Sequence, residues 1–215
     1  LTVNDLTTSF AIRNASLQAV SDVSFSVEEG DCLGIVGESG CGKSTTGYSI
    51  MRLLPNNGRI ESGSIEFDGR DLTKISEKEM RGIRGNTIAL IPQDPMTSLN
   101  PVVRIGTQIG EALRIHNGAS KAESYARALE VLKMVEMPNP EERLNQYPHE
   151  LSGGMQQRVG LARAFAMDTD ILLMDEPFSA LDPLIRAQLQ DELILLQEKL
   201  NKTILFVSHE IGRAH

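Results

Sequence analysis

The sequence lacks the features of a membrane-spanning, secreted or disulfide-linked protein. No apolar run approaches the roughly 18 to 20 residues that a membrane-spanning helix needs, and the first ten residues lack the basic and apolar regions of a signal peptide. Cys32 and Cys41 lie too close together to link distant segments, and there is no second pair of cysteines to complete a metal site. We therefore expect a soluble, intracellular chain in a reducing compartment.

An excess of basic residues is also lacking. The formal net charge is -8 at pH 7, whereas a protein that coats nucleic acid usually carries a basic surface. We therefore expect no nucleic acid among the partners, while a local pocket for an anion stays compatible with this charge. The 215 residues suffice for one core with a smaller attached subdomain. Because the chain starts without Met and stops soon after an apolar run, we expect a fragment whose carboxyl-terminal part is missing.

Four short apolar runs have the composition of buried strands. They are LGIV at 33–36, IALI at 88–91, ILLM at 171–174 and ILFV at 204–207. Each run is followed at once by polar residues. Because ligands of open parallel sheets bind beyond the carboxyl ends of the strands, we expect these four exits to converge on one site.

Helical patterns separate the predicted strands, as the crossovers of a parallel sheet require. Asp182 suits an N-cap and Pro183 the first position of a helix that carries apolar residues at helical spacing. Ser120 with Glu123 three residues later predicts a capping box at the start of another helix. The stretch 97–150 has no good strand and is predicted to form a helical subdomain.

The segment GESGCGKS, from Gly37 to Ser44, matches the phosphate-loop pattern G-x-x-x-x-G-K-[ST] between a predicted strand and a predicted helix. Its glycines allow backbone N–H groups to face phosphate oxygens, Lys43 reaches the β and γ phosphates, and the Ser44 hydroxyl can hold Mg²⁺. The alternative is a tight glycine turn with an exposed lysine, which the strand context disfavours. The predicted nucleotide contacts are Gly37, Glu38, Ser39, Gly40, Cys41, Gly42, Lys43, Ser44 and Thr45.

Two carboxylates follow the third apolar run directly. Asp175 is placed to bind Mg²⁺, directly or through water, as the acidic counterpart of the phosphate loop. Glu176 is then the candidate that orients and deprotonates the attacking water. The alternative is a pair of solvated acids at a strand end, which the phosphate loop in the same chain makes less favoured.

The segment LSGGMQQ at 151–157 decides between the classes of phosphate-loop protein. Ser152 is suited to cap a helix, and Gly153 and Gly154 bare the first N–H groups of that helix, where its dipole favours an anion. The heptapeptide resembles the signature motif of the ATP-binding cassette (ABC) ATPases, and it precedes the Asp-Glu pair by the spacing that this family shows. An ordinary capped helix is the alternative.

The resemblance covers essentially the whole chain and implies further roles. Gln93 matches the glutamine that touches Mg²⁺ and water and couples ATP to the membrane partner. Ser179 to Asp182 (SALD) matches a loop that crosses to the second subunit, and His209 matches the switch histidine that contacts the γ phosphate. Phe10 resembles the aromatic residue on which adenine stacks, although it equally suits the core of an edge strand.

The fold that the resemblance implies is α/β: a phosphate-loop NTPase with a mainly parallel core sheet, an amino-terminal antiparallel β subdomain and an inserted helical subdomain. Alternation at 21–31 and 63–69 is consistent with the antiparallel part. One ABC ATPase domain would then comprise a RecA-like core at 1–96 and 151–215 and a helical subdomain at 97–150.

The implied function is hydrolysis of ATP with Mg²⁺ to power import of a small solute. The implied partners are integral membrane permease subunits, a second ATPase subunit, identical or related, and indirectly an extracytoplasmic solute-binding protein. The implied location is peripheral, at the cytoplasmic face of the inner membrane. We also expect Met96 to Leu99 to lie against a membrane subunit, because an exposed apolar patch often marks an interface.

Different segments of the sequence resemble different branches of the transporter family. IPQDPMTSLNP at 91–101 and MRLLP at 51–55 resemble importers of oligopeptides, dipeptides and nickel, whereas DEPFSALDPLIRAQLQDEL at 175–193 resembles the ATPases of glycine betaine and other quaternary-amine importers. We favour peptides, because the segment around Gln93 faces the membrane subunits. A soluble, non-transport ABC ATPase is a further alternative. A long coiled-coil insertion or a second cassette would favour it, and neither occurs within this sequence.

Overall fold

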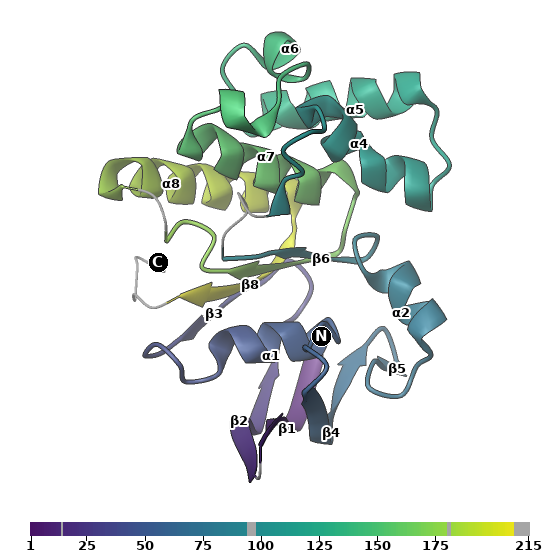
Figure 1. Ribbon diagram of the computed structural model, residues 1–215, viewed down its shortest axis with the longest axis vertical. Coiled ribbons are helices and arrows are strands. Elements are labelled where there is room, and N and C mark those ends of the chain that lie inside the picture. The colour runs from purple at the N-terminus through teal and green to yellow at the C-terminus, as the bar shows by residue number, and fades with distance from the viewer. Residues whose placement is uncertain (14, 94–97, 180–181, 209–215) are drawn as a thin grey trace.

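A computed structural model describes residues 1–13, 15–93, 98–179 and 182–208 of the chain (Figure 1). The four predicted apolar strands form one parallel sheet with the order β3-β8-β7-β6. Their bounds are β3 Cys32–Val36, β6 Ile88–Ile91, β7 Ile171–Asp175 and β8 Thr203–Ser208. All four strands were predicted correctly to within a residue at each end.

The register of this sheet aligns the carboxyl ends of its strands. Val36 pairs with Ser208, Asp175 pairs with Val207, and Ile91 pairs with Met174. The segments that leave β3, β6 and β7 therefore start from the same edge of the sheet, as the sequence predicts.

A second sheet is antiparallel, with the order β2-β1-β4-β5. It consists of β1 Thr2–Ile12, β2 Ala15–Ser26, β4 Gly58–Phe67 and β5 Arg70–Asp71. The predicted strand at 21–31 is wrong at both ends, because β2 starts earlier and the chain turns after Ser26, where the N–H of Asp31 donates to the carbonyl of Glu28. Helix α1 (Lys43–Ile50) lies between the two sheets (Figure 1).

The other helices with described bounds are α2 Glu77–Ile83, α4 Ile105–His116, α5 Lys121–Met134, α6 Pro140–Arg143, the 3₁₀ helix η1 Pro148–Glu150, α7 Gly153–Ala166 and α8 Pro183–Leu200. The capping box of α5 is confirmed, because the Ser120 side chain accepts from the N–H of Glu123 while the Glu123 carboxylate accepts from the N–H of Ser120. The predicted start of α8 is confirmed too, with Asp182 Oδ1 accepting from the N–H of Leu184 at 3.1 Å. Where a helical subdomain begins and ends stays a prediction.

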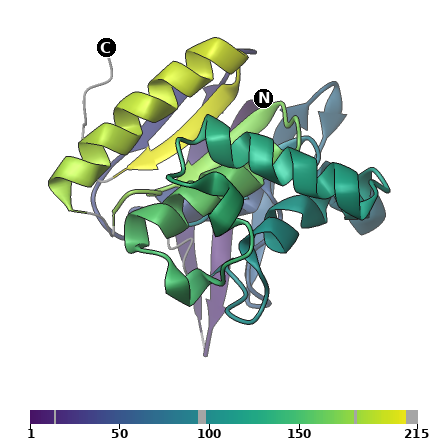
Figure 2. The ribbon, with the colours of Figure 1, turned by 90° about the horizontal axis from the view of Figure 1, so that it is seen from above.

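Two apolar clusters fill the two faces of the parallel sheet. Leu172 and Met174 of β7 pack in the cluster under α4, α5, α7 and α8, whereas Ile171 and Leu173 pack in the cluster that includes Ile50 of α1. This explains why the strand is a continuous apolar run. Helices α7 and α8 cover one face of the sheet (Figures 1 and 2), and α1 covers the other (Figure 1).

Within the part of the chain that the structure describes, no helix combines the length and the apolar composition of a membrane span.

Candidate functional site

The loop between β3 and α1 is shaped by glycine. Gly40 and Gly42 have φ angles of +82° and +94°, in the left-handed region that favours glycine. A Cβ added to Gly42 would lie 2.2 Å from the carbonyl oxygen of Ala19, so the site excludes any side chain by space as well as by φ. Gly42 is also the N-cap residue of α1 and offers no side-chain oxygen to the helix. The loop therefore leads directly into a helix start whose first N–H groups suit an anion.

Lys43 is the first residue of α1 and is only 5% exposed. Its ammonium donates to the carbonyl oxygens of Gly37 and Glu38, both at 2.8 Å, and lies 3.8 Å from the sulfur of Cys41. The carbonyl groups of the loop therefore surround the ammonium. The alternative of a glycine turn with an exposed lysine is wrong, because Lys43 is buried. A buried cation with carbonyl acceptors is suited to exchange those contacts for phosphate oxygens.

The Ser44 hydroxyl and the Asp175 carboxylate meet at the carboxyl end of β7. Ser44 Oγ donates to Asp175 Oδ1 at 2.7 Å, although the two residues are far apart in sequence. Asp175 is 4% exposed. Tyr48, one turn after Ser44 on α1, lies near the same carboxylate: burial first and the negative charge of Asp175 second raise the pKa of its phenol. The sequence reading missed Tyr48, although its i, i+4 spacing from Ser44 placed it on the same helix face.

Glu176 and Gln93 form a second pair at the same edge. Gln93 Nε2 donates to Glu176 Oε2 at 3.1 Å, and Glu176 is 6% exposed. The backbone of Glu176 is left-handed, with φ of 45°, which is uncommon outside glycine and costs on the order of 1 kcal/mol or more. The structure compensates this cost: the N–H of Glu176 donates to the carbonyl of Val207 at 3.0 Å, and its carbonyl accepts from the N–H and hydroxyl of Ser179. Such enforced backbone geometry is concentrated at functional sites.

The oxygen donors at this edge fit Mg²⁺. Ser44 and Asp175 offer hard oxygen ligands side by side, and Mg²⁺ typically takes one or two carboxylates, with water and substrate phosphates completing its shell. Among the residues described, no group of three or more His, Cys, Asp and Glu side chains is arranged to hold a metal.

The LSGGMQQ segment at 151–157 lies at the start of α7. Helix α7 starts at Gly153, and Ser152 caps it by accepting from the N–H of Met155 at 3.3 Å. A Cβ added to Gly153 would meet no atom within 4 Å beyond its chain neighbours and the backbone of its own helix, so packing against other parts of the described chain does not require glycine there. Because α7 and α1 cover opposite faces of the parallel sheet (Figure 1), the two helix starts that suit an anion do not share one face of this chain.

Phe10 lies on β1 opposite Gly58 of β4. A Cβ on Gly58 would lie 2.7 Å from Cε1 of Phe10, so the ring packs directly over the glycine backbone. Phe10 is half-buried, which leaves part of the ring available for a ligand. His209, Met96 and, within the SALD segment, Ala180 and Leu181 lie outside the described residues.

Leu99 corrects one expectation. It is 4% exposed and belongs to the core cluster with Ile105 and Ile109, so the prediction that it lies against a membrane subunit is wrong. Among the described residues that follow Gln93 and precede α4, Val102 is an exposed apolar one, at 79%. The neighbouring segment is held by Arg163 of α7, which the sequence reading also missed and which donates to the carbonyl of Ser98 at 3.0 Å.

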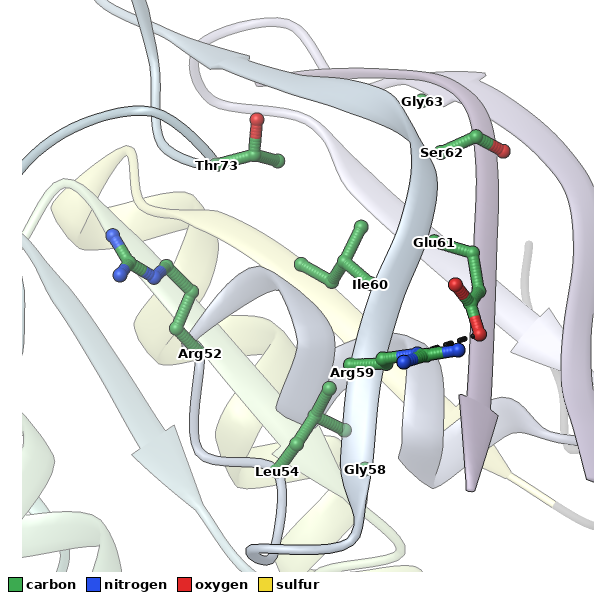
Figure 3. Close-up of a pocket in the computed structure, with 9 residues that line it drawn as sticks. All are labelled: Arg52, Leu54, Gly58, Arg59, Ile60, Glu61, Ser62, Gly63 and Thr73. Carbon is green, nitrogen blue, oxygen red and sulfur yellow. Dashed lines mark hydrogen bonds and ion pairs between the residues drawn. The ribbon is translucent and has the colours of Figure 1, made fainter. Parts of the chain in front are cut away.

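An open hollow of about 420 Å³ lies beside β4 in the antiparallel sheet (Figure 3). Two arginines line it, but both are engaged. Arg59 pairs with Glu61 at 2.8 Å, and Arg52 donates to the carbonyls of Leu72 and Ile75. The hollow is therefore a weaker candidate for an anion than the strand exits.

The chain belongs to the ABC transporter family, which residues 20–179 match. A probable peptide ABC transporter ATP-binding protein of Sinorhizobium fredii is 47% identical over 99% of this chain and 64% of its own length. The oligopeptide transport ATP-binding protein of Bacillus subtilis is 47% identical over 99% of this chain and 60% of its own. The dipeptide transport ATP-binding protein of Escherichia coli is 45% identical over 99% of this chain and 65% of its own. The chain thus spans less than two thirds of the length of these relatives.

The fold is also that of solved cassettes. The dimeric structure of an ATP-binding cassette in a post-hydrolysis state, bound to ADP and Pi, has a TM-score of 0.86 and 31% identity. The alignment covers 98% of this chain and 88% of that one. A dimeric bacterial ABC transporter cassette aligns equally well, with a TM-score of 0.86 and 30% identity. The predicted family and fold class are therefore confirmed.

Proposed function

We propose that this chain binds ATP with Mg²⁺ and hydrolyses it at the carboxyl edge of the parallel sheet. The observation that carries the proposal is the meeting of two pairs there: Ser44 with Asp175, and Gln93 with Glu176. The loop from Gly37 to Thr45 would surround the phosphates with backbone N–H groups, and Lys43 would contact the β and γ phosphates. Phe10 would stack on the adenine.

The metal site would be formed by Ser44 and Asp175, with Gln93 at its margin. When bound, Mg²⁺ neutralises charge that develops on the transferred phosphoryl group. Glu176 would accept a proton from the attacking water, whose oxygen forms a bond to the γ phosphorus while the bond to the bridging oxygen of ADP breaks. The hydrogen bond from Gln93 holds that carboxylate in place, and His209 would contact the γ phosphate.

The same proposal extends to transport. The relatives named above are peptide, oligopeptide and dipeptide transport proteins, which favours import of peptides over quaternary amines and over a soluble, non-transport role. The chain would act peripherally at the cytoplasmic face of the inner membrane, with permease subunits in the membrane and, indirectly, a solute-binding protein outside. The dimeric cassettes with the same fold support pairing with a second ATPase domain, in which Ser152, Gly153 and Gly154 of one domain face the ATP of the other.

Substitution Lys43→Ala tests the nucleotide site. We expect the dissociation constant for ATP to rise roughly 10- to 150-fold, because a hydrogen bond between charged groups is lost. The matched control is Lys202→Ala, which removes a half-buried ammonium next to the amino end of β8 that pairs with Asp168. Binding of a fluorescent ATP analogue measures both. An affinity unchanged by Lys43→Ala would show that the loop does not hold phosphate.

Val102→Ser tests whether the exposed segment before α4 contacts a permease subunit. We expect solute uptake by the assembled transporter to fall several-fold while ATP hydrolysis by the isolated chain stays at the parental rate, because Val102 is exposed and makes no part of the catalytic edge. Ile115→Ser is the control, since Ile115 is 70% exposed at the other end of α4. Equal losses of uptake in the two variants would contradict a specific contact at Val102.

A further inference from the structure

An ion pair joins α7 to α8 away from the strand exits. Nη1 of Arg158, on α7, donates to Oε2 of Glu192, on α8, at 2.6 Å, and Nη2 donates to Oε1 at 3.0 Å. The side chains are only 12% and 15% exposed. Two parallel hydrogen bonds between a planar guanidinium and a carboxylate allow little sliding or rotation of one helix against the other.

Additional contacts fix each member of the pair. Nη1 of Arg158 also donates to the carbonyl of Val135, the C-cap residue of α5. Gln188, one turn earlier on α8, donates to Oε1 of Glu192 at 2.9 Å. The guanidinium therefore holds three helices at one point, and the carboxylate is oriented by its own helix.

The two helices carry different parts of the proposed active site. Ser152 caps α7, and Arg158 follows it by about 9 Å along the helix axis at ~1.5 Å per residue. Helix α8 begins at Pro183, shortly after Glu176. The ion pair thus connects the helix that would face a second nucleotide with the segment that leaves the proposed base.

Packing of α7 against α8 would not by itself require the charges of Arg158 and Glu192. A buried ion pair gains little over a well-packed apolar pair, since the desolvation of both charges offsets their attraction. Leu189 and Leu193 already pack α8 into the core cluster, but apolar contacts are less directional. We infer that Arg158 and Glu192 are positioning residues, which set the start of α7 relative to α8 so that Ser152 meets the nucleotide of a second domain correctly. This inference rests on the proposed function.

The first test is Arg158→Lys in the full chain, because lysine keeps the charge but cannot form the fork. We expect kcat for ATP hydrolysis to fall roughly tenfold or more while KM for ATP and the affinity of the monomer for ATP change less than about twofold, since misplacement affects the closed site and not the phosphate loop. Glu192→Gln is an independent second variant with the same expected split. The exchange Arg158→Glu with Glu192→Arg should recover part of kcat relative to either single reversal.

Arg84→Lys is the matched control. Arg84 is 18% exposed, pairs with Glu77 and donates to the carbonyls of Met51 and Arg52, but it lies beside α1 and α2. A purely structural role predicts that both lysine variants lower the melting temperature and that neither changes kcat of the folded protein. If Arg158→Lys and Glu192→Gln keep the parental kcat, or if Arg84→Lys loses as much kcat as Arg158→Lys, the positioning role is contradicted. The proposed function is not contradicted by either result. A parent chain without ATP hydrolysis would overturn the proposed function and this inference together.

Discussion

Glu176→Gln is expected to reduce steady ATP turnover by roughly 10²- to 10⁴-fold, the usual contribution of a general base. The amide keeps the shape of the side chain and can still accept the hydrogen bond that Gln93 donates at 3.1 Å, so the site should keep its geometry. What it loses is the group that takes the proton from water. The affinity for ATP should stay within about twofold of the parent, because the substitution leaves the phosphate loop intact.

Phosphate release and nucleotide binding, measured on the same preparation, separate these two effects. Glu79→Gln serves as the control, since Glu79 lies in the capping box of α2 and accepts from Ser76, on an exposed part of the surface. Its turnover should be parental. Turnover by Glu176→Gln within a few-fold of the parent would reject Glu176 as the base.

Glu176→Gln should also form a dimer that depends on ATP and Mg²⁺, and adding Ser152→Arg should abolish that dimer. The reason lies in the fold: α1 and α7 cover opposite faces of the parallel sheet, so the start of α7 needs a second chain to supply its anion (Figure 1). Two such chains in head-to-tail pairing satisfy both helix starts twice, as a closed two-fold dimer requires. In the proposed dimer, hydrolysis would remove the γ phosphate that both domains contact, so the two domains would then separate and pass motion to the proposed membrane subunits.

Ser120→Arg in the Glu176→Gln background is the matched control for that result. Ser120 caps α5 by the same kind of bond that Ser152 makes in α7, with its hydroxyl accepting from the N–H of Glu123 at 3.2 Å. Both arginine variants therefore lose one cap, and only Ser152→Arg crowds the proposed interface. Light scattering with ATP and Mg²⁺ should give a dimer for the control and a monomer for the Ser152 variant. A dimer in both would contradict the composite site.

Amino-acid composition predicted best the strands whose two faces are both buried. Strand β7 is apolar from Ile171 to Met174 because successive side chains enter two different cores, and this leaves a continuous run in the sequence. The starts of α5 and α8 were predictable for a different reason, since each depends on a cap within a few residues. Strand β2 was misjudged because it lies in the antiparallel sheet, where exposed positions interrupt the pattern.

Features that depend on contacts between residues far apart in the sequence could not be predicted from local patterns. Leu99 is an apolar residue in a polar stretch, and only the packing of α4 shows that it belongs to the core. The burial of Lys43 depends on the path of the loop carbonyls around it. The left-handed backbone of Glu176 is stabilised by hydrogen bonds to Val207, on a neighbouring strand, and to Ser179. Local patterns thus predicted which edge of the sheet carries the proposed site, while the geometry of that edge came from tertiary contacts.

A structure of the Glu176→Gln protein with ATP and Mg²⁺ would test the central claim most directly. The account predicts the triphosphate along Gly37 to Thr45, in contact with Lys43, and the metal at Ser44 and Asp175. A nucleotide bound elsewhere, for example in the hollow beside β4 (Figure 3), with the loop free of phosphate, would contradict it.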